Sequence, residues 1–236
     1  MVQSGFFRED PKHDRLQSGF FKILDWIALH RQTFFSVTGT IAVIAIIAIF
    51  TFVNFKNLNT RAADQLVSAR NLYLSGDFDG AIRTYDGILT QFPHTPSATE
   101  SWAGKGDVFF KQRKFAEAVD SYQKCLEKKS SEKSMPIVLA SLAAAQENNN
   151  QIDAAIATYQ KFFEQFPNHF YAPKMYESLA RCYELSSNVE AAKQTYEKII
   201  TLYPNTSWVD FARIRYQILS PKPFESGQAA APVSQK

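Results

Sequence analysis

The segment FDGAIRTYDGILTQFP, residues 78–93, contains a pattern that three later segments of the chain repeat. In each segment an alanine is followed four residues later by a tyrosine, at Ala81 and Tyr85, Ala118 and Tyr122, Ala155 and Tyr159, and Ala192 and Tyr196. Each alanine lies 37 residues after the preceding one. A constant interval of this kind does not follow from composition, so the chain contains an internal repeat.

Two further positions recur with the same interval. Another small residue stands twelve positions before each alanine, at Ala69, Gly106, Ala143 and Ala180. A proline stands twelve positions after three of the alanines, at Pro93, Pro167 and Pro204, and Ser130 takes this place in the second repeat. Small residues let two helices approach closely, and the tyrosine one turn further along fills the gap against the next repeat. Proline ends a helix because it lacks a backbone N–H, so we expect two helices per repeat.

Polar segments divide each repeat between its two helices, so we expect repeats near residues 60–93, 97–130, 136–167 and 171–204. The first helices are expected near residues 60–75, 97–112, 136–148 and 171–186, and the second near 78–91, 115–128, 152–165 and 189–202. Residues 205–219 predict a capping helix, because the last repeat has no neighbour to cover it. Its expected apolar contacts are Trp208, Phe211, Ala212 and Ile218.

Residues 60–204 resemble the tetratricopeptide repeat (TPR) family. The residues that carry the resemblance are Trp102, Gly106, Phe109, Ala118 and Tyr122 in the second repeat, and Tyr176, Ala180, Tyr183, Ala192, Tyr196 and Pro204 in the fourth. The first and third repeats depart from the family at Gln65 and Leu139, where an aromatic residue is usual. The usual period is ~34 residues, and we expect the loops between repeats to hold the additional ones. The resemblance implies an all-α solenoid of four helical hairpins.

In the TPR family the first helices line a concave groove that binds an extended peptide or a helix of a partner protein. Carried over position by position, the resemblance implies that the groove residues are Leu66, Arg70, Tyr73, Asp107, Phe110, Glu177, Arg181 and Glu184, with Ala103, Ala140 and Ala144 between them. The alternative is that these residues are only the exposed face of a solenoid. The lysine–asparagine grid of the Hsp90-type clamp is missing, because Leu66, Ala103 and Ala140 hold its lysine positions. A cytosolic co-chaperone of that kind is therefore disfavoured.

Ahead of the repeats, the 24 residues between Arg31 and Lys56 carry no charged side chain. A helix of this length spans roughly 36 Å, whereas the hydrocarbon core of a bilayer is ~30 Å thick. The run is too long for a cleavable signal peptide and is followed by no cleavage site. We therefore expect a single transmembrane helix at residues 34–55.

Two terminal segments flank the span and the repeats. The leader, residues 1–33, contains QSGFF twice, at residues 3–7 and 17–21, and its last part predicts a short amphipathic helix at the membrane surface. The duplication is either a contact motif or chance. The tail, residues 220–236, is rich in Pro, Ala, Gly and Ser and is expected to be disordered.

No residue pattern in the chain predicts an enzyme, a cofactor, a metal site or a small-molecule substrate. The four histidines are scattered, and no nucleophile has a plausible histidine partner. The net charge of +3 is small and the basic residues are dispersed, so a nucleic-acid partner is not expected. Cys125 and Cys182 lie more than a repeat apart, so we expect two free thiols.

Lysine and arginine residues near a span favour the cytoplasmic side. Within about twenty residues of the span they number three on each side, and the leader carries two more, Arg8 and Lys12. We therefore expect a cytoplasmic N-terminus and periplasmic repeats, anchored in a bacterial inner membrane.

A short leader, one span and exported repeats resemble the ancillary subunit of the SecYEG translocon, the YfgM-like family. The loop phrases QFPHTPSATES and QFPNHFYAPKM are similar to those of envelope TPR proteins such as BamD and CpoB. The resemblance implies a scaffold that assists envelope protein trafficking or assembly by binding translocon or assembly proteins. The alternatives are a structural scaffold of an envelope machine (flagellar, pilus or division complex) and an organelle import receptor with cytosolic repeats.

Overall fold

The computed structural model describes residue 26, residues 28–128 and residues 131–220. The chain forms two compact units, residues 1–57 and residues 58–236. The described residues form nine α-helices and no strand, which confirms the expected all-α fold. Both QSGFF segments, most of the predicted leader helix and the tail beyond Ser220 lie outside the described residues.

Helix α2 (Arg31–Ser75) begins in the first unit and ends in the second. Among the described residues it is the one helix long and apolar enough to cross a membrane, judged by length and composition. Its apolar side chains in the first unit are exposed, including Ile41, Ile47 and Phe50. The sequence predicts two separate helices at residues 34–55 and 60–75, whereas α2 covers both ranges without a break.

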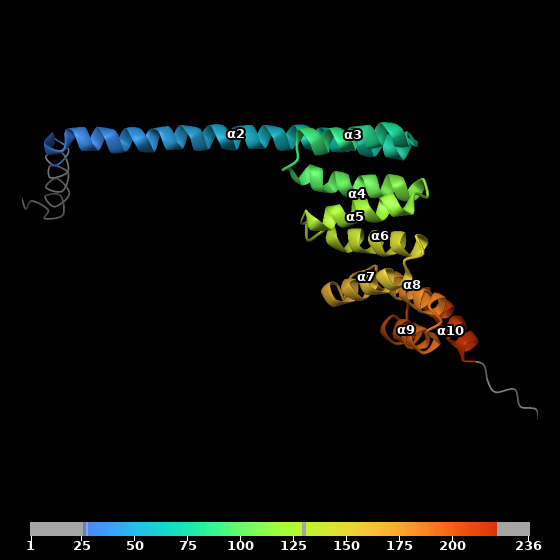
Figure 1. Cartoon of the computed structure of the whole chain (residues 1–236). Coiled ribbons are helices and arrows are strands. Elements are labelled where there is room, and N and C mark those ends of the chain that lie inside the picture. The colour runs from blue at the N-terminus through green and yellow to red at the C-terminus, as the bar shows by residue number, and fades with distance from the viewer. Residues whose placement is uncertain (1–25, 27, 129–130, 221–236) are drawn as a thin grey trace, which may run out of the picture. The chain divides into compact units, whose positions relative to one another are not determined.

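The second unit contains the end of α2 and eight further helices. These are α3 (Phe78–Gln91), α4 (Pro96–Lys111), α5 (Phe115–Glu127), α6 (Met135–Asn148), α7 (Ile152–Gln165), α8 (Ala172–Leu185), α9 (Val189–Leu202) and α10 (Trp208–Leu219). They stack in chain order (Figure 1). Their bounds lie within two residues of the predicted ranges, except that α10 begins three residues later than expected.

The helices of the second unit form two layers. The first helices of successive repeats contact one another, α4 with α6 and α6 with α8, and α8 contacts α10. The second helices α3, α5, α7 and α9 make no comparable contact with one another within the described residues. The layer of first helices is therefore the more closely spaced one, which is the geometry of the inner, concave side of a solenoid.

The repeated alanines and tyrosines form the core between the layers. All four alanines are fully buried, and the four tyrosines are at most 3% exposed. A Cβ atom added to Gly106 would lie 2.5 Å from Cε1 of Tyr122, so no larger residue fits there without displacing the ring. The close approach that the small residues predict is therefore confirmed, and it sets the spacing within each hairpin.

Each hairpin turns through one residue with a positive φ, at Gly76 (84°), Arg113 (61°), Asn150 (60°) and Ser187 (60°). These residues again lie 37 apart. In the first hairpin the Asp77 N–H donates to the Leu72 carbonyl at 2.9 Å and the Gly76 N–H donates to the Tyr73 carbonyl at 3.1 Å, which is a Schellman motif. Glycine and asparagine tolerate this backbone conformation, whereas arginine and serine adopt it at a cost.

The capping helix α10 packs differently from the sequence expectation. Ala212 is buried against α9 with Trp208 beside it, and the Phe211 ring lies edge-on to the Tyr196 ring at 6.2 Å between centroids, so these three predicted contacts are present. Ile218 is 58% exposed, so the prediction that it is a cap contact is wrong. The reason is helical phase, because Ile218 stands one repeat interval after Arg181, on the side of the helix that faces the groove.

Both cysteines are free and buried, in two different hydrophobic clusters. Burial raises the pKa of Cys125 to about 11 and that of Cys182 to about 12, so both remain protonated at neutral pH. Both side chains therefore act as small apolar groups of the core.

Two glycine-to-alanine changes test the turn geometry. Gly76→Ala should lower the free energy of unfolding by ~1 kcal/mol or more, because alanine adopts a positive φ only under strain. Gly87→Ala is the matched control: Gly87 lies inside α3, where an added Cβ makes only an ordinary contact of 3.8 Å. It should raise the free energy of unfolding by up to ~1 kcal/mol. Urea denaturation followed by circular dichroism measures both, and effects of the same sign would contradict the assigned turn.

A candidate partner-binding groove

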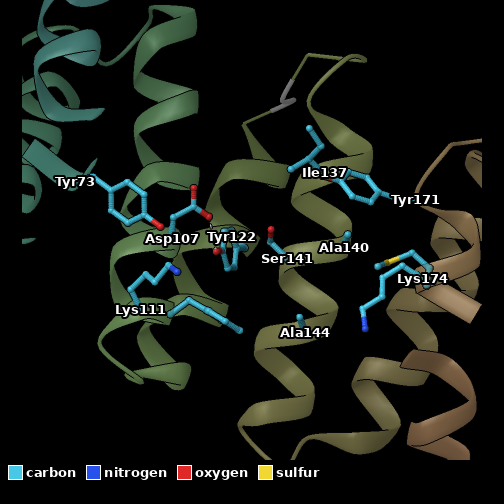
Figure 2. Close-up of a pocket in the computed structure, with 12 residues that line it drawn as sticks. Tyr73, Asp107, Lys111, Tyr122, Ile137, Ala140, Ser141, Ala144, Tyr171 and Lys174 are labelled. Atoms are coloured by element: carbon cyan, nitrogen blue, oxygen red, sulfur yellow. Dashed lines mark hydrogen bonds between the residues drawn. The ribbon is translucent and has the colours of Figure 1, made fainter. Parts of the chain in front are cut away.

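Two adjoining hollows lie on the concave side of the second unit. We call them the α4 hollow, about 370 Å³, and the α6 hollow, about 350 Å³, after the helices that supply their floors. Tyr73, Asp107 and Ile137 line both, so the hollows are continuous. Figure 2 shows the α6 hollow, with Tyr73 and Asp107 on one side and Ala140 and Ala144 of α6 facing them.

Small residues make the floors of these hollows. Ala103 and Gly104 lie beneath the α4 hollow, and Ala140, Ser141 and Ala144 lie beneath the α6 hollow. These residues have a short side chain or, in Gly104, none, so the surface is recessed at these points. Larger apolar side chains stand at the edges, where Leu74 is 78% exposed and Ile137 is 49% exposed. An exposed apolar rim around a recessed floor is typical of a binding surface.

The structure brings four of the residues implied by the TPR resemblance together around the hollows: Arg70, Tyr73, Asp107 and Phe110. Tyr73 and Phe110 also pack at the ends of their own hairpins, with ring centroids 6.0 Å from Phe78 and 5.4 Å from Phe115 respectively. Each ring therefore forms part of the groove surface and also packs within its own hairpin. Leu66 is 5% exposed within the first hydrophobic cluster and offers a partner little surface.

The remaining implied residues, Glu177, Arg181 and Glu184, lie further along the groove in ion pairs. Arg181 contacts Glu147 through two bonds, Nε to Oε1 at 2.6 Å and Nη2 to Oε2 at 3.0 Å, and Nη1 lies 2.5 Å from Glu177. The hydrogen bond to Glu147 raises the pKa of Arg181. Because Glu147 belongs to α6 and Arg181 to α8, the pair joins two repeats.

A second ion pair joins the last repeat to the cap. Arg215 of α10 binds both carboxylate oxygens of Glu184 on α8. The resemblance omitted Glu147 and Arg215, although Glu147 stands one repeat interval before Glu184 and could have been found from that spacing.

Buried tyrosine hydroxyls donate to three of the groove acids. Tyr122 donates to Asp107 at 2.7 Å, Tyr159 to Glu147 at 3.3 Å and Tyr196 to Glu184 at 2.7 Å. Shielding from water raises the pKa of Asp107, whereas the hydrogen bond from Tyr122 and the charge of Arg70 oppose that rise. Asp107 is an exposed residue, so its carboxylate lies at the surface of the hollow while it accepts the hydrogen bond from Tyr122.

The acidic side chains of the groove take part in contacts between helices. Within the described residues no group of three or more His, Cys, Asp or Glu side chains is placed to hold a metal ion. The acids of the groove hold tyrosine hydroxyls and arginines, and both interactions fix neighbouring helices in place.

Sequence models of the tetratricopeptide repeat match residues 66–132, 141–169 and 178–206, together more than half of the chain. No curated protein sequence matches the chain. Among solved structures, MamA protein is 20% identical, with a TM-score of 0.55 over 67% of this chain and 84% of that one. A tetratricopeptide repeat protein from Parabacteroides merdae is 16% identical, with a TM-score of 0.59 over 67% and 60%. At such identities the likeness shows the fold alone.

Arg181→Met tests the ion pair between α6 and α8. The change should lower the free energy of unfolding by ~1–3 kcal/mol, because Glu147, whose side chain is 11% exposed, would lose its cation. Arg70→Met is the control, since Arg70 and Glu100 form a pair with side chains 55% and 41% exposed. Its cost should stay below ~1 kcal/mol. Urea unfolding at neutral pH measures both, and equal costs would show that Arg181 stabilises no more than a surface pair.

Proposed function

This chain belongs to the tetratricopeptide repeat family, whose repeats are protein–protein interaction scaffolds, and from that premise we propose that the α4 and α6 hollows bind a segment of a partner protein. The observation that carries the proposal is the continuous recessed surface with exposed apolar edges at Leu74 and Ile137. Burial of such edges on binding supplies roughly 25 cal/mol per Å² of apolar surface. A partner segment with large apolar side chains would fill the recessed floors.

We further propose that residues 34–55 anchor the protein in a membrane. None of the side chains in this segment is buried within the chain, so the helix has no protein core around it. Its hydroxyl groups donate to carbonyls of the same helix: Thr38 to Phe34 at 2.7 Å, and Thr51 to Ile47 at 2.9 Å. In a bilayer every polar group must be satisfied internally, and these hydroxyls meet that requirement.

The proposed topology places the leader (1–33) in the bacterial cytoplasm, the span in the inner membrane and the repeats (60–219) with the tail (220–236) in the periplasm. In this arrangement the groove meets proteins after their export. The resemblance to the YfgM-like family and to BamD and CpoB supports a role in envelope protein trafficking or assembly. Translocon and assembly proteins are then the expected partners.

Reporter fusions test the topology. A reporter joined after Ser220 should be active if its folding requires export, and inactive if it requires the cytoplasm. The same two reporters joined within the leader should show the opposite pattern. Activity of the cytoplasmic reporter after Ser220 would place the repeats in the cytosol and favour an import receptor.

Site-specific photocrosslinking tests the groove. A benzoylphenylalanine at Ile137, on the edge of both hollows, should capture the partner in intact cells. The same group at Gln123, an exposed position of the second helix α5, should capture none. The paired change Leu74→Ala and Ile137→Ala should weaken partner binding by ~2 kcal/mol or more if these edges are hot spots. Both side chains are exposed, so the fold should stay intact.

The identity of the captured protein distinguishes the proposed roles. Translocon or exported proteins crosslinked at Ile137 would support trafficking, whereas subunits of one large assembly would support a structural scaffold. Equal capture from Ile137 and Gln123, or undiminished binding by the double variant, would show that the hollows are not the binding surface.

A further inference from the structure

The last two hairpins contain the same three-residue unit. In the third repeat Tyr159 donates to Glu147, and Arg181 of the next repeat pairs with that acid. In the fourth repeat Tyr196 donates to Glu184, which pairs with Arg215 of α10. Each unit consists of a buried tyrosine, a groove acid and an arginine from the following helix of the inner layer. The arginine balances the negative charge of the acid, whose side chain is only 11% exposed in Glu147 and 17% exposed in Glu184.

The second repeat contains a buried tyrosine and a groove acid but no such arginine, and its acid stands about one helical turn earlier than Glu147 and Glu184, whose position is held by Phe110. Tyr122 donates to Asp107 at 2.7 Å. One repeat interval before Arg181 the following helix carries Ala144, and two intervals before Arg215 it carries Ser141. Both small residues form the floor of the α6 hollow, which Asp107 also lines. The hollow therefore occupies the place that an arginine side chain fills in the later repeats.

The cations around Asp107 do not replace that arginine. Arg70 lies near enough to influence the acid, but its Nη2 atom is 2.6 Å from Glu100. Lys174 lines the same hollow and is 2.5 Å from Glu177. Lys111 lines the hollow as well. Within the described part of the chain no ion pair joins Asp107 to any of the three.

We propose that the α6 hollow receives an arginine side chain of the partner protein, which pairs with Asp107 and so completes the unit that the chain leaves unfinished. This inference rests on the proposed function of the groove. Arginine fits better than lysine, because its planar guanidinium binds a carboxylate through two bonds and stacks on aromatic rings such as that of Tyr73. Apolar residues beside the arginine would contact Ile137 and Phe110, which line the same hollow.

The electrostatics of the site support this choice of partner. Asp107 is exposed in the free protein, and the atoms around it shield it enough to raise its pKa. A partner that covers the hollow shields the carboxylate further and adds to the cost of keeping it charged. A bound cation offsets that cost, whereas a bound anion increases it. Partner segments with glutamate or aspartate at this point should therefore be rejected.

A pair of synthetic peptides tests the inference with the full chain in detergent micelles. The first is a blocked five-residue peptide with arginine at its centre and leucine on each side, and its twin carries citrulline, the uncharged isostere. The arginine peptide should bind the wild-type protein about 10-fold more tightly or better, as expected for a charge-assisted pair. Asp107→Asn should remove this preference. Asp120→Asn, which removes an acid of the same charge on α5, should leave the preference unchanged.

A further variant supplies the missing cation from the chain itself. Ser141→Arg places arginine at the position that Arg215 holds in the cap, so the preference for the arginine peptide should fall to that of Asp107→Asn. A melting temperature equal to or above that of the wild type would show that the variant folds. Equal binding of both peptides to the wild type, no binding of either, or a preference that survives Asp107→Asn would overturn the inference. If a partner crosslinks at Ile137 but the two peptides bind equally well, the proposed function of the groove would still hold and only the arginine site would be rejected.

Discussion

The structure depends on four buried tyrosines, each pressed against a glycine or alanine of the neighbouring helix. A tyrosine ring fills the space between two hairpins, but its hydroxyl cannot be buried without a hydrogen-bond partner. Three of these hydroxyls find an acid on the inner layer, and two of those acids find an arginine on the next helix of that layer. Burial of the tyrosine rings is thus accompanied by a network of hydrogen bonds and ion pairs, which links successive repeats and ends on the concave surface.

This network of hydrogen bonds and ion pairs divides the concave surface into two kinds of region. Toward the C-terminus, Arg181 and Arg215 fill the groove and hold α6, α8 and α10 together. Toward the N-terminus, alanine, glycine and serine take the corresponding positions, and hollows remain. The ion pairs of Arg181 and Arg215 stabilise the C-terminal half of the solenoid. No arginine stands at the corresponding positions of the N-terminal half, where the hollows of the proposed binding surface remain. The positions that hold stabilising arginines in the later repeats therefore line the proposed binding surface in the earlier one.

The sequence predicts the repeat helices closely because their signals are local and periodic, as at Ala118, Tyr122 and Gly106. It does not indicate that Arg113 and Ser187 take the left-handed turn conformation, since neither residue type favours it. The pair of Glu147 and Arg181 was missed because its partners lie 34 residues apart on different hairpins and leave no local pattern. The exposure of Ile218 is not predicted, because apolar spacing does not distinguish the core side of a helix from an apolar groove side.

The Schellman turns recur at the same interval as the tyrosines, so every hairpin starts and ends in one register. Within the described residues each repeat contacts only its neighbours, and the buried alanine and tyrosine recur in every hairpin. Gene duplication or deletion of a whole 37-residue unit would therefore keep each tyrosine with its small partner, whereas deletion of half a hairpin would separate the two. The length of the groove can change in evolution by single steps of one hairpin, while the cap keeps its own contacts.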